Sequence, residues 1–257
     1  MLLVLAVFVL FLVACGGGGA EPTATSPGAS PSPSGTKPST EQSPAQPPGG
    51  TQIKDEAVAF GTEDGITIRG HLYSVPGPTR RVVVFAHEYP KDQRAWQGFA
   101  HELVAPGVAT LTFDFRGYGE TGGSKDAAKI DLDLDAAVRF LKSRDYPLVY
   151  VVGASMGGTA ALKVAARQDL AGVVSVSAPT NFMGLDARQD VASVSERKLF
   201  IASRGDGDAP AAVTFFMQSA PDPKQSQLFD GSAHGSELLQ GASAGAFERL
   251  VIDFVSN

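Results

Sequence analysis

The sequence predicts an α/β fold, with a mostly parallel sheet of eight strands and helices on both faces. Three observations predict it. Apolar runs alternate with helical patterns from about residue 53 to the C-terminus. The later apolar runs are continuous, which is typical of strands buried on both faces. The first two instead alternate polar and apolar side chains, and Glu63-Asp64-Gly65 supplies a turn between them, so we expect an antiparallel hairpin.

The elements follow one another along the chain. We expect strands at 57–60, 66–73, 81–87, 109–115, 148–154, 172–178, 198–203 and 226–230. Helical patterns fill the intervals at 94–105, 128–144, 156–168, 184–195, 209–219 and 236–255. Right-handed crossovers bring the carboxyl ends of parallel strands to one edge of the sheet, where sites form in open α/β folds.

The N-terminal segment indicates export. Residues 1–14, MLLVLAVFVLFLVA, are apolar but too short to span a bilayer comfortably. Leu12-Val13-Ala14-Cys15 resembles the lipobox of bacterial lipoproteins, in which the cysteine thiol receives a diacylglyceryl group. No Lys or Arg precedes the apolar run, whereas export signals normally begin with a positive charge. We expect a signal peptide at 1–14, lipidation of Cys15, and a protein anchored by lipid to a bacterial membrane or cell surface. A plain cleaved signal peptide or a short membrane anchor is the alternative.

Composition divides the rest of the chain into a linker and one domain. Residues 16–50 are mostly Gly, Pro, Ser, Thr and Ala, so we expect 15–52 to hold the lipidated Cys15 and a disordered tether. Residues 53–257, about 205 in all, suffice for one domain with a sizeable core. The net charge of −6 without a basic stripe predicts no nucleic-acid partner. Cys15 is the only cysteine, so no disulfide within the chain and no cysteine-based metal site is expected.

Residues 148–158, LVYVVGASMGG, have the layout of a nucleophile elbow. A buried strand leads into Ser155, and a helical pattern follows at once. Gly153 and Gly157 remove side chains that would collide with neighbouring backbone at this tight turn. The backbone N–H of Met156 would point to a developing oxyanion. A second GxSxG string surrounds Ser243, but no strand precedes it, so Ser155 is the predicted nucleophile.

A serine hydroxyl needs a base, and the base needs an orienting acid. His234 lies in a Gly-rich loop after the last predicted strand, and we interpret it as the base. His71 and His101 are interpreted as surface or packing residues. Asp206, in the turn after the 198–203 strand, is the predicted acid. Asp208 is the alternative, although an N-cap role at the following helix suits it better.

The order Ser155, Asp206, His234 resembles that of the α/β-hydrolase superfamily, and the resemblance covers essentially the whole domain. Residues 114–121, DFRGYGET, look like the superfamily's DxRGxGxS loop, and VVVFAHEYP resembles the strand and loop that carry an oxyanion residue. By that match, the backbone N–H of Tyr89 joins that of Met156 in the oxyanion hole.

Glu88 stands where the superfamily usually has Gly. A glutamate at this place resembles the dienelactone hydrolase branch, in which it interacts with the resting nucleophile, although that branch uses a cysteine nucleophile. A carboxylate beside an oxyanion opposes negative charge unless it is turned away, paired or protonated. We hypothesise that Arg116 neutralises it.

The resemblance implies ester hydrolysis through an acyl-enzyme, with no metal or organic cofactor. Only about 20 residues separate the 172–178 and 198–203 strands, the usual place of a lid, so we expect little or no lid and an open cleft for small or accessible esters. Its expected walls are His87, Glu88, Trp96, Phe182 and Met183, with the Tyr89 side chain beside them. The alternatives are a dienelactone hydrolase-like or peptidase-like enzyme of the same fold, and a non-catalytic surface lipoprotein.

Overall fold

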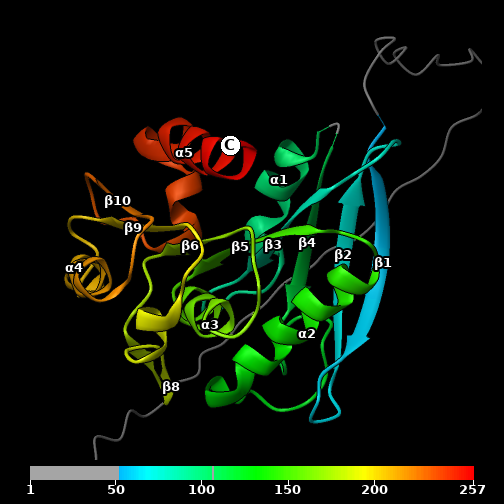
Figure 1. Cartoon of the computed structure of the whole chain (residues 1–257), viewed down its shortest axis with the longest axis horizontal. Helices are drawn as coiled ribbons and strands as arrows, with labels where there is room; N and C mark the ends of the chain where they lie inside the picture. Colours follow the sequence, from blue (N-terminus) through cyan, green and yellow to red (C-terminus); the bar gives the residue numbers. More distant parts are fainter. Residues whose placement is uncertain (1–51, 106) are drawn as a thin grey trace, which may run out of the picture. The chain divides into compact units, whose positions relative to one another are not determined.

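The central sheet of the molecule has the order β1-β2-β4-β3-β5-β6-β9-β10 (Figure 1). The computed structural model describes residues 52–105 and 107–257. Within them the strands of this sheet are β1 (Lys54–Gly61), β2 (Thr67–Ser74), β3 (Arg81–Ala86), β4 (Val108–Asp114), β5 (Leu148–Ala154), β6 (Gly172–Val176), β9 (Lys198–Ser203) and β10 (Lys224–Phe229). β2 is antiparallel to both of its neighbours, and all the other pairs are parallel. The predicted fold class is confirmed.

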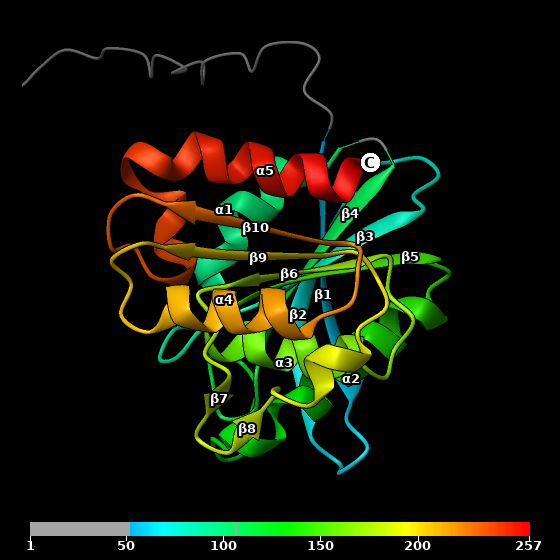
Figure 2. The same ribbon diagram turned by 60° about the vertical axis from the view of Figure 1, so that its left-hand side comes forward.

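Helices cover both faces of the sheet (Figure 2). α1 (Arg94–Leu103) and α5 (Ala244–Ser256) lie on one face. α2 (Ile130–Ser143), α3 (Met156–Ala165) and α4 (Ala209–Ser219) lie on the other. In β3, Val82 and Val84 pack toward the α2 side, while Val83 and Phe85 pack toward the α1 side. This double burial explains why the central strands are continuously apolar.

The segment between β6 and β9 differs from the prediction. The expected helix at 184–195 is wrong: the chain forms the hairpin β7 (Asn181–Phe182) and β8 (Leu185–Asp186), followed by a 3₁₀ turn at Asp190–Ser193. Met183 and Gly184, with φ of 48° and 95°, make the hairpin turn, which a helix excludes. These short elements form no separate lid domain, as expected.

The C-terminal helical pattern is also interrupted. Residues 235–239 and 241–243 form 3₁₀ turns, and α5 begins only at Ala244. Gly241 adopts a φ of 73°, which breaks helical continuity there. Ser243 precedes α5 directly, and no strand leads into it.

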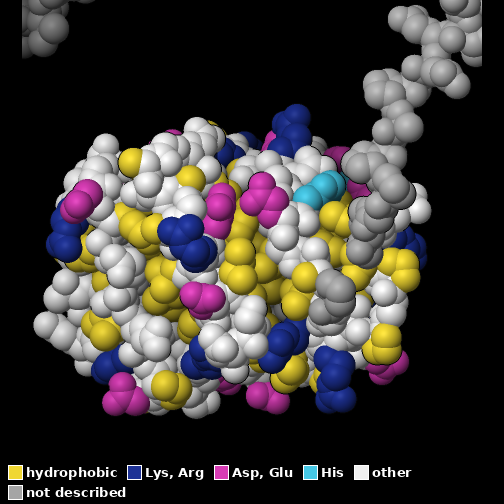
Figure 3. Space-filling view, turned by 90° about the horizontal axis from the view of Figure 1, so that it is seen from above, with side chains coloured by type: hydrophobic (Ala, Val, Ile, Leu, Met, Phe, Trp, Pro, Cys, Tyr) yellow, Lys and Arg dark blue, Asp and Glu magenta, His cyan; other side chains and the backbone are white. Residues whose placement is uncertain are grey.

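The molecular surface on the side of α1 and α5 has interspersed acidic and basic side chains (Figure 3). No continuous basic surface gathers in this view. Among the described residues, none of the helices combines the length and apolar character that crossing a bilayer requires.

Candidate active site

Ser155 occupies a strained turn between β5 and α3. Its φ of 49° and ψ of −116° are unfavourable for a residue with a side chain, and its N–H donates to Val176 O at 2.8 Å. A Cβ placed on Gly153 would lie 2.2 Å from Gly157 O, and one on Gly157 would lie 2.4 Å from Ala86 O. Both glycines are therefore required by close backbone approach.

The structure brings His234 and Asp206 together. Asp206 Oδ1 lies 2.8 Å from His234 Nδ1, so Nδ1 carries the proton that this carboxylate accepts. The other ring nitrogen, Nε2, is then free to act as an acceptor. Asp208 is exposed at the start of α4 and forms no hydrogen bond with His234 within the described chain. Of the two predicted acids, Asp206 has the geometry for orienting His234.

Hydrogen bonds between the loops after β9 and β10 fix the positions of Asp206 and His234 relative to each other. Arg204 N donates to Phe229 O and Gly205 N to Gly231 O, both at 2.8 Å, which extends the parallel strand pairing. Ser203 Oγ, at the end of β9, donates to Ala233 O at 2.7 Å. The turn that carries Asp206 and the loop that carries His234 are thus connected directly.

Ser155, Asp206 and His234 line one cavity of about 600 Å³. Its other walls come from the loop after β6 and from α4: Ser177, Pro179, Thr180, Asn181, Gly207, Asp208, Ala209, Ala211, Ala212 and Phe215. Among the described residues no hydrogen bond joins Ser155 Oγ to His234. Such contacts often tighten only when substrate is bound.

The two predicted oxyanion donors come from adjoining backbone segments. A Cβ on Gly157 would also lie 2.6 Å from His87 O, so the loop after β3 packs against the N-terminus of α3. Within residues 52–105 and 107–257, neither Tyr89 N–H nor Met156 N–H is used in a hydrogen bond. The N-terminal end of α3 adds a favourable dipole for negative charge. Both groups are available to an oxyanion.

Glu88 is buried, and its carboxylate turns toward the segment after His234. Its Oε1 accepts hydrogen bonds from Ser236 Oγ at 2.5 Å and Ser236 N at 3.2 Å, and Lys91 Nζ lies 2.9 Å away. Burial raises the pKa of Glu88, but the hydrogen bonds from Ser236 and Lys91 outweigh burial and lower the pKa below its usual value. The negative charge is therefore paired with Lys91.

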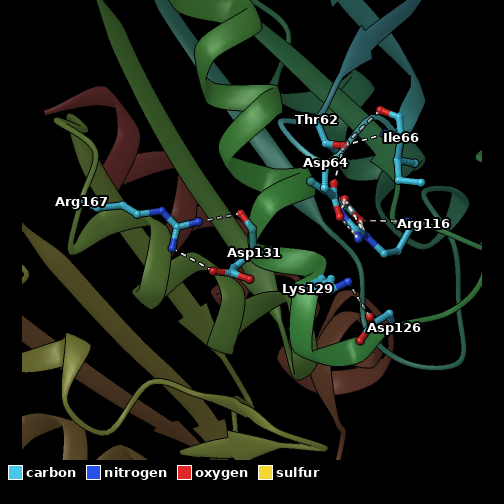
Figure 4. Close-up of polar contacts among 9 residues, drawn as sticks. Thr62, Asp64, Ile66, Arg116, Asp126, Lys129, Asp131 and Arg167 are labelled. Atoms are coloured by element: carbon cyan, nitrogen blue, oxygen red, sulfur yellow. Dashed lines mark hydrogen bonds and ion pairs between the residues drawn. The ribbon is translucent and has the colours of Figure 1, made fainter.

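The hypothesis that Arg116 neutralises Glu88 is wrong. Arg116 is buried beside α2, where Nη2 and Nε donate to Asp133 Oδ1 at 2.6 and 2.9 Å. Its Nη1 donates to Asp64 Oδ2, in the β1–β2 turn, at 2.7 Å (Figure 4). The hydrogen bonds from Arg116 and Thr62 hold the pKa of Asp64 well below its usual range. The guanidinium is fully occupied by these two carboxylates.

None of the five predicted wall residues lines the cavity that contains Ser155. Glu88 is described above. His87 is buried: its Nε2 accepts a hydrogen bond from Phe115 N at 3.1 Å, and burial lowers its pKa, so the ring is a neutral support for the loop. Trp96 is enclosed under α1 and donates from Nε1 to Ala86 O.

The other two wall residues lie at the β7–β8 hairpin. Met183 is 75% exposed at its turn. Phe182 contacts the Tyr89 ring, with 6.0 Å between centroids, and Tyr89 is itself 51% exposed. The walls of the Ser155 cavity come instead from α4 and from the loop after β6. These segments are distant in the sequence and meet only in the folded chain, so no local sequence pattern predicts their contact.

Sequence reasoning also missed three serines that support the site. Ser177, with a φ of 51°, accepts a hydrogen bond from Gly235 N at 3.0 Å. Ser203 and Ser236 contact the His234 loop and Glu88, as described. Ser177 directly follows the buried strand β6 and Ser203 ends the buried strand β9, both at the carboxyl edge of the sheet. This position after an apolar run is visible in the sequence and would have identified them.

Comparisons with known proteins give a family model, solved structures and a relative that this chain resembles. A family model described as "Serine aminopeptidase, S33" matches residues 77–199. The solved structure of the Pyrococcus furiosus esterase Pf2001 superposes with a TM-score of 0.66 at 20% identity, covering 79% of this chain and 91% of the esterase. A dienelactone hydrolase from Anabaena variabilis superposes with a TM-score of 0.67 at 21% identity, covering 79% and 97%. An uncharacterized protein of Mycobacterium tuberculosis is 25% identical over 208 residues, which are 72% of this chain and 74% of that protein.

The chain has the α/β-hydrolase fold. The family model matches the part of this fold from residue 77 to residue 199, which includes β3 to β6 and the Ser155 turn.

Proposed function

We propose that this protein is a serine hydrolase that cleaves carboxylic esters of small or accessible substrates. The observation that carries the proposal is the 2.8 Å contact between Asp206 and His234, in the same cavity as a serine on a strained strand-to-helix turn. Backbone strain of this kind is costly and persists where function depends on it.

In the proposed mechanism, His234 Nε2 takes the Ser155 proton while Oγ attacks the ester carbonyl carbon. Asp206 holds the imidazole orientation and stabilises its protonated form. The N–H groups of Tyr89 and Met156 donate to the carbonyl oxygen as it becomes negative. The alcohol leaves with the proton from His234, and water then attacks the acyl-enzyme with His234 again as base.

The cavity supports a short or open substrate. Its lining combines the apolar Ala209, Ala211, Ala212 and Phe215 with the polar Thr180 and Asn181. The Ser155 cavity has a volume of about 600 Å³, which suits a small molecule better than a long lipid. The match to the family model described as a serine aminopeptidase makes aminoacyl amides the second substrate class to test.

The test is the Ser155→Ala variant, assayed with p-nitrophenyl acetate and butyrate. We expect turnover to fall at least about a thousandfold, because no nucleophile is left to form the acyl-enzyme. Ser243→Ala is the matched control, since it changes the second GxSxG serine and should retain full activity. A fluorophosphonate probe should label the wild type and Ser243→Ala but not Ser155→Ala. Ester turnover or labelling retained in Ser155→Ala refutes the assignment.

We also propose that the enzyme is exported and anchored through a lipid on Cys15. The support is the sequence of residues 1–15, which lie outside the described part of the chain. A Cys15→Ser protein should appear in the medium rather than in the membrane fraction. Membrane retention equal to that of the wild type contradicts the anchor.

A further inference from the structure

A buried carboxylate joins two loops of the site that are far apart in sequence. Glu88 directly precedes Tyr89, whose N–H is a proposed oxyanion donor. Ser236 lies two residues after His234, the proposed base. Glu88 Oε1 accepts from both the hydroxyl and the N–H of Ser236, a contact between residues separated by 148 positions. Lys91 Nζ completes the cluster, at 2.9 Å from Glu88 Oε1 and 3.0 Å from Ser236 Oγ.

The carboxyl group lies beside the backbone that carries the nucleophile and the base. A Cβ placed on Gly235 would be 3.2 Å from the Glu88 carboxyl carbon and 3.2 Å from Ala154 Cβ. Gly235 follows His234, and Ala154 precedes Ser155. The Glu88 carboxyl therefore packs against the segment next to the base, at a point that also touches the segment next to the nucleophile.

A contribution to the stability of the fold does not by itself explain why position 88 carries a charged side chain. The Glu88 side chain is 2% exposed, and its Oε2 is buried with no hydrogen-bond partner among the described residues. The contacts from Ser236 and Lys91 all reach Oε1 and favour the ionised form, but they leave the buried Oε2 without a partner, and replacing a buried ion pair with apolar residues is often neutral or stabilising. A charged group that is only partly satisfied, and that contacts the loop of the base, indicates a role in the site.

We propose that Glu88 is a positioning residue that ties the His234 loop to the oxyanion loop through Ser236 and Lys91. The tie keeps the imidazole and the Tyr89 N–H in a fixed relation while charge moves between Ser155 and the substrate. This inference rests on the proposed function. It differs from a contact with the resting nucleophile, because the carboxylate binds the segment after the base.

Kinetics of four variants test the tie. Glu88→Ala removes it, Glu88→Gln keeps an acceptor for Ser236, and Ser236→Ala removes the hydroxyl donor while keeping the backbone N–H. Glu56→Gln is the matched control. Glu56, like Glu88, is a glutamate paired with basic side chains, here a lysine and an arginine, but it lies on β1 at the far edge of the sheet. We expect Glu88→Ala to lower kcat by about 10- to 100-fold with KM within about twofold, since small misplacements of a base cost rate more than binding.

The conservative variant separates positioning from general damage. Glu88→Gln should recover most of the kcat lost in Glu88→Ala, and Glu56→Gln should match the wild type. Combining Glu88→Ala with Ser236→Ala should cost no more than Glu88→Ala alone, because both remove one interaction. Unchanged kcat in folded Glu88→Ala, or losses that multiply in the double variant, overturns the proposal. If Glu88→Ala does not fold, Ser236→Ala decides, with a lower kcat supporting the tie and an unchanged kcat overturning it.

Amide hydrogen exchange gives a readout that does not need activity. The Ser236 N–H donates to Glu88, so Glu88→Ala should lose protection at residues 234–237 and keep it elsewhere. If the wild type neither hydrolyses esters nor reacts with the fluorophosphonate, the proposed function fails. The exchange result still decides the structural tie: local loss of protection supports it, and unchanged protection overturns it.

Discussion

Two ionic clusters of this molecule, each with a buried carboxylate, differ in how the carboxylate oxygens are hydrogen-bonded. In the Arg116 cluster, formed by Asp64, Arg116 and Asp133, both oxygens of each carboxylate accept a hydrogen bond. In the Glu88 cluster, formed by Glu88, Lys91 and Ser236, one oxygen takes every contact and the other takes none within the described chain. Asp206 repeats the second pattern, because Oδ1 binds His234 while the buried Oδ2 has no partner there.

The difference separates groups that stabilise the fold from groups that serve the site. The Arg116 cluster joins the β1–β2 turn to α2: Arg116 and Asp133 are buried, Asp64 is exposed, and every carboxylate oxygen accepts a hydrogen bond. Glu88 and Asp206 each leave one buried carboxylate oxygen without a hydrogen-bond partner among the described residues, and both contact the segment that carries His234. Functional sites are where such local costs persist. Changes to the first cluster should therefore alter stability, and changes beside His234 should alter rate.

The largest effect is expected for Asp206→Asn. An amide in place of the carboxylate no longer stabilises the protonated imidazole and favours the wrong tautomer, so kcat should fall by about 10³- to 10⁴-fold. The free energy of unfolding should change by about 1 kcal/mol or less, because only one hydrogen bond is altered. Ester kinetics and chemical denaturation measure both quantities. Asp208→Asn is the control, and an equal loss of kcat in that variant would show that the acid has been misassigned.

Arg116→Met should lower the stability of the fold and leave kcat nearly unchanged. It leaves Asp133 buried without its cation, so we expect the free energy of unfolding to fall by about 3–5 kcal/mol. In the fraction that remains folded, kcat should stay within about threefold of the wild type, because the Arg116 side chain is not part of the Ser155 cavity. Arg188→Met breaks an exposed ion pair with Asp186 and should leave the free energy of unfolding nearly unchanged. Loss of activity in folded Arg116→Met would mean that the two clusters are not separate.

Patterns local in sequence predicted the elements that carry Ser155, His234 and Asp206. Continuous apolar runs located the central strands, because such strands are buried on both faces. The Gly153 and Gly157 spacing located the elbow, because close backbone approach at that turn excludes a side chain. These constraints act within a few residues, so a single sequence displays them.

The contacts that the sequence did not predict connect distant segments. Arg116 reaches Asp64 across 52 positions, and Glu88 reaches Ser236 across 148. Each arginine or glutamate has several oppositely charged or polar groups within reach in principle, and only the packed fold selects one. The helix expected at 184–195 failed for a related reason: Ala187, Val191 and Val194 have helical spacing, but the fold buries them in a segment that follows a hairpin and contains a 3₁₀ turn.

The smallest expected effect is the pH dependence of stability contributed by Glu88. Burial alone would raise the pKa of this carboxyl, but the hydrogen bonds from Ser236 and Lys91 lower it below the ordinary 4.5 in the folded chain. A lowered folded pKa means that the ionised group stabilises the fold fully above that ordinary value, and that this contribution is lost as the pH falls through the folded pKa. The wild type should therefore gain unfolding free energy relative to Glu88→Gln as the pH rises from about 3 to 6, and the difference should be constant above that range. Denaturant melts of both proteins across this interval measure it. A difference that does not vary with pH, or that shrinks as the pH rises, would show that Ser236 and Lys91 do not hold Glu88 ionised, and the contrast with the Arg116 cluster would then need another origin.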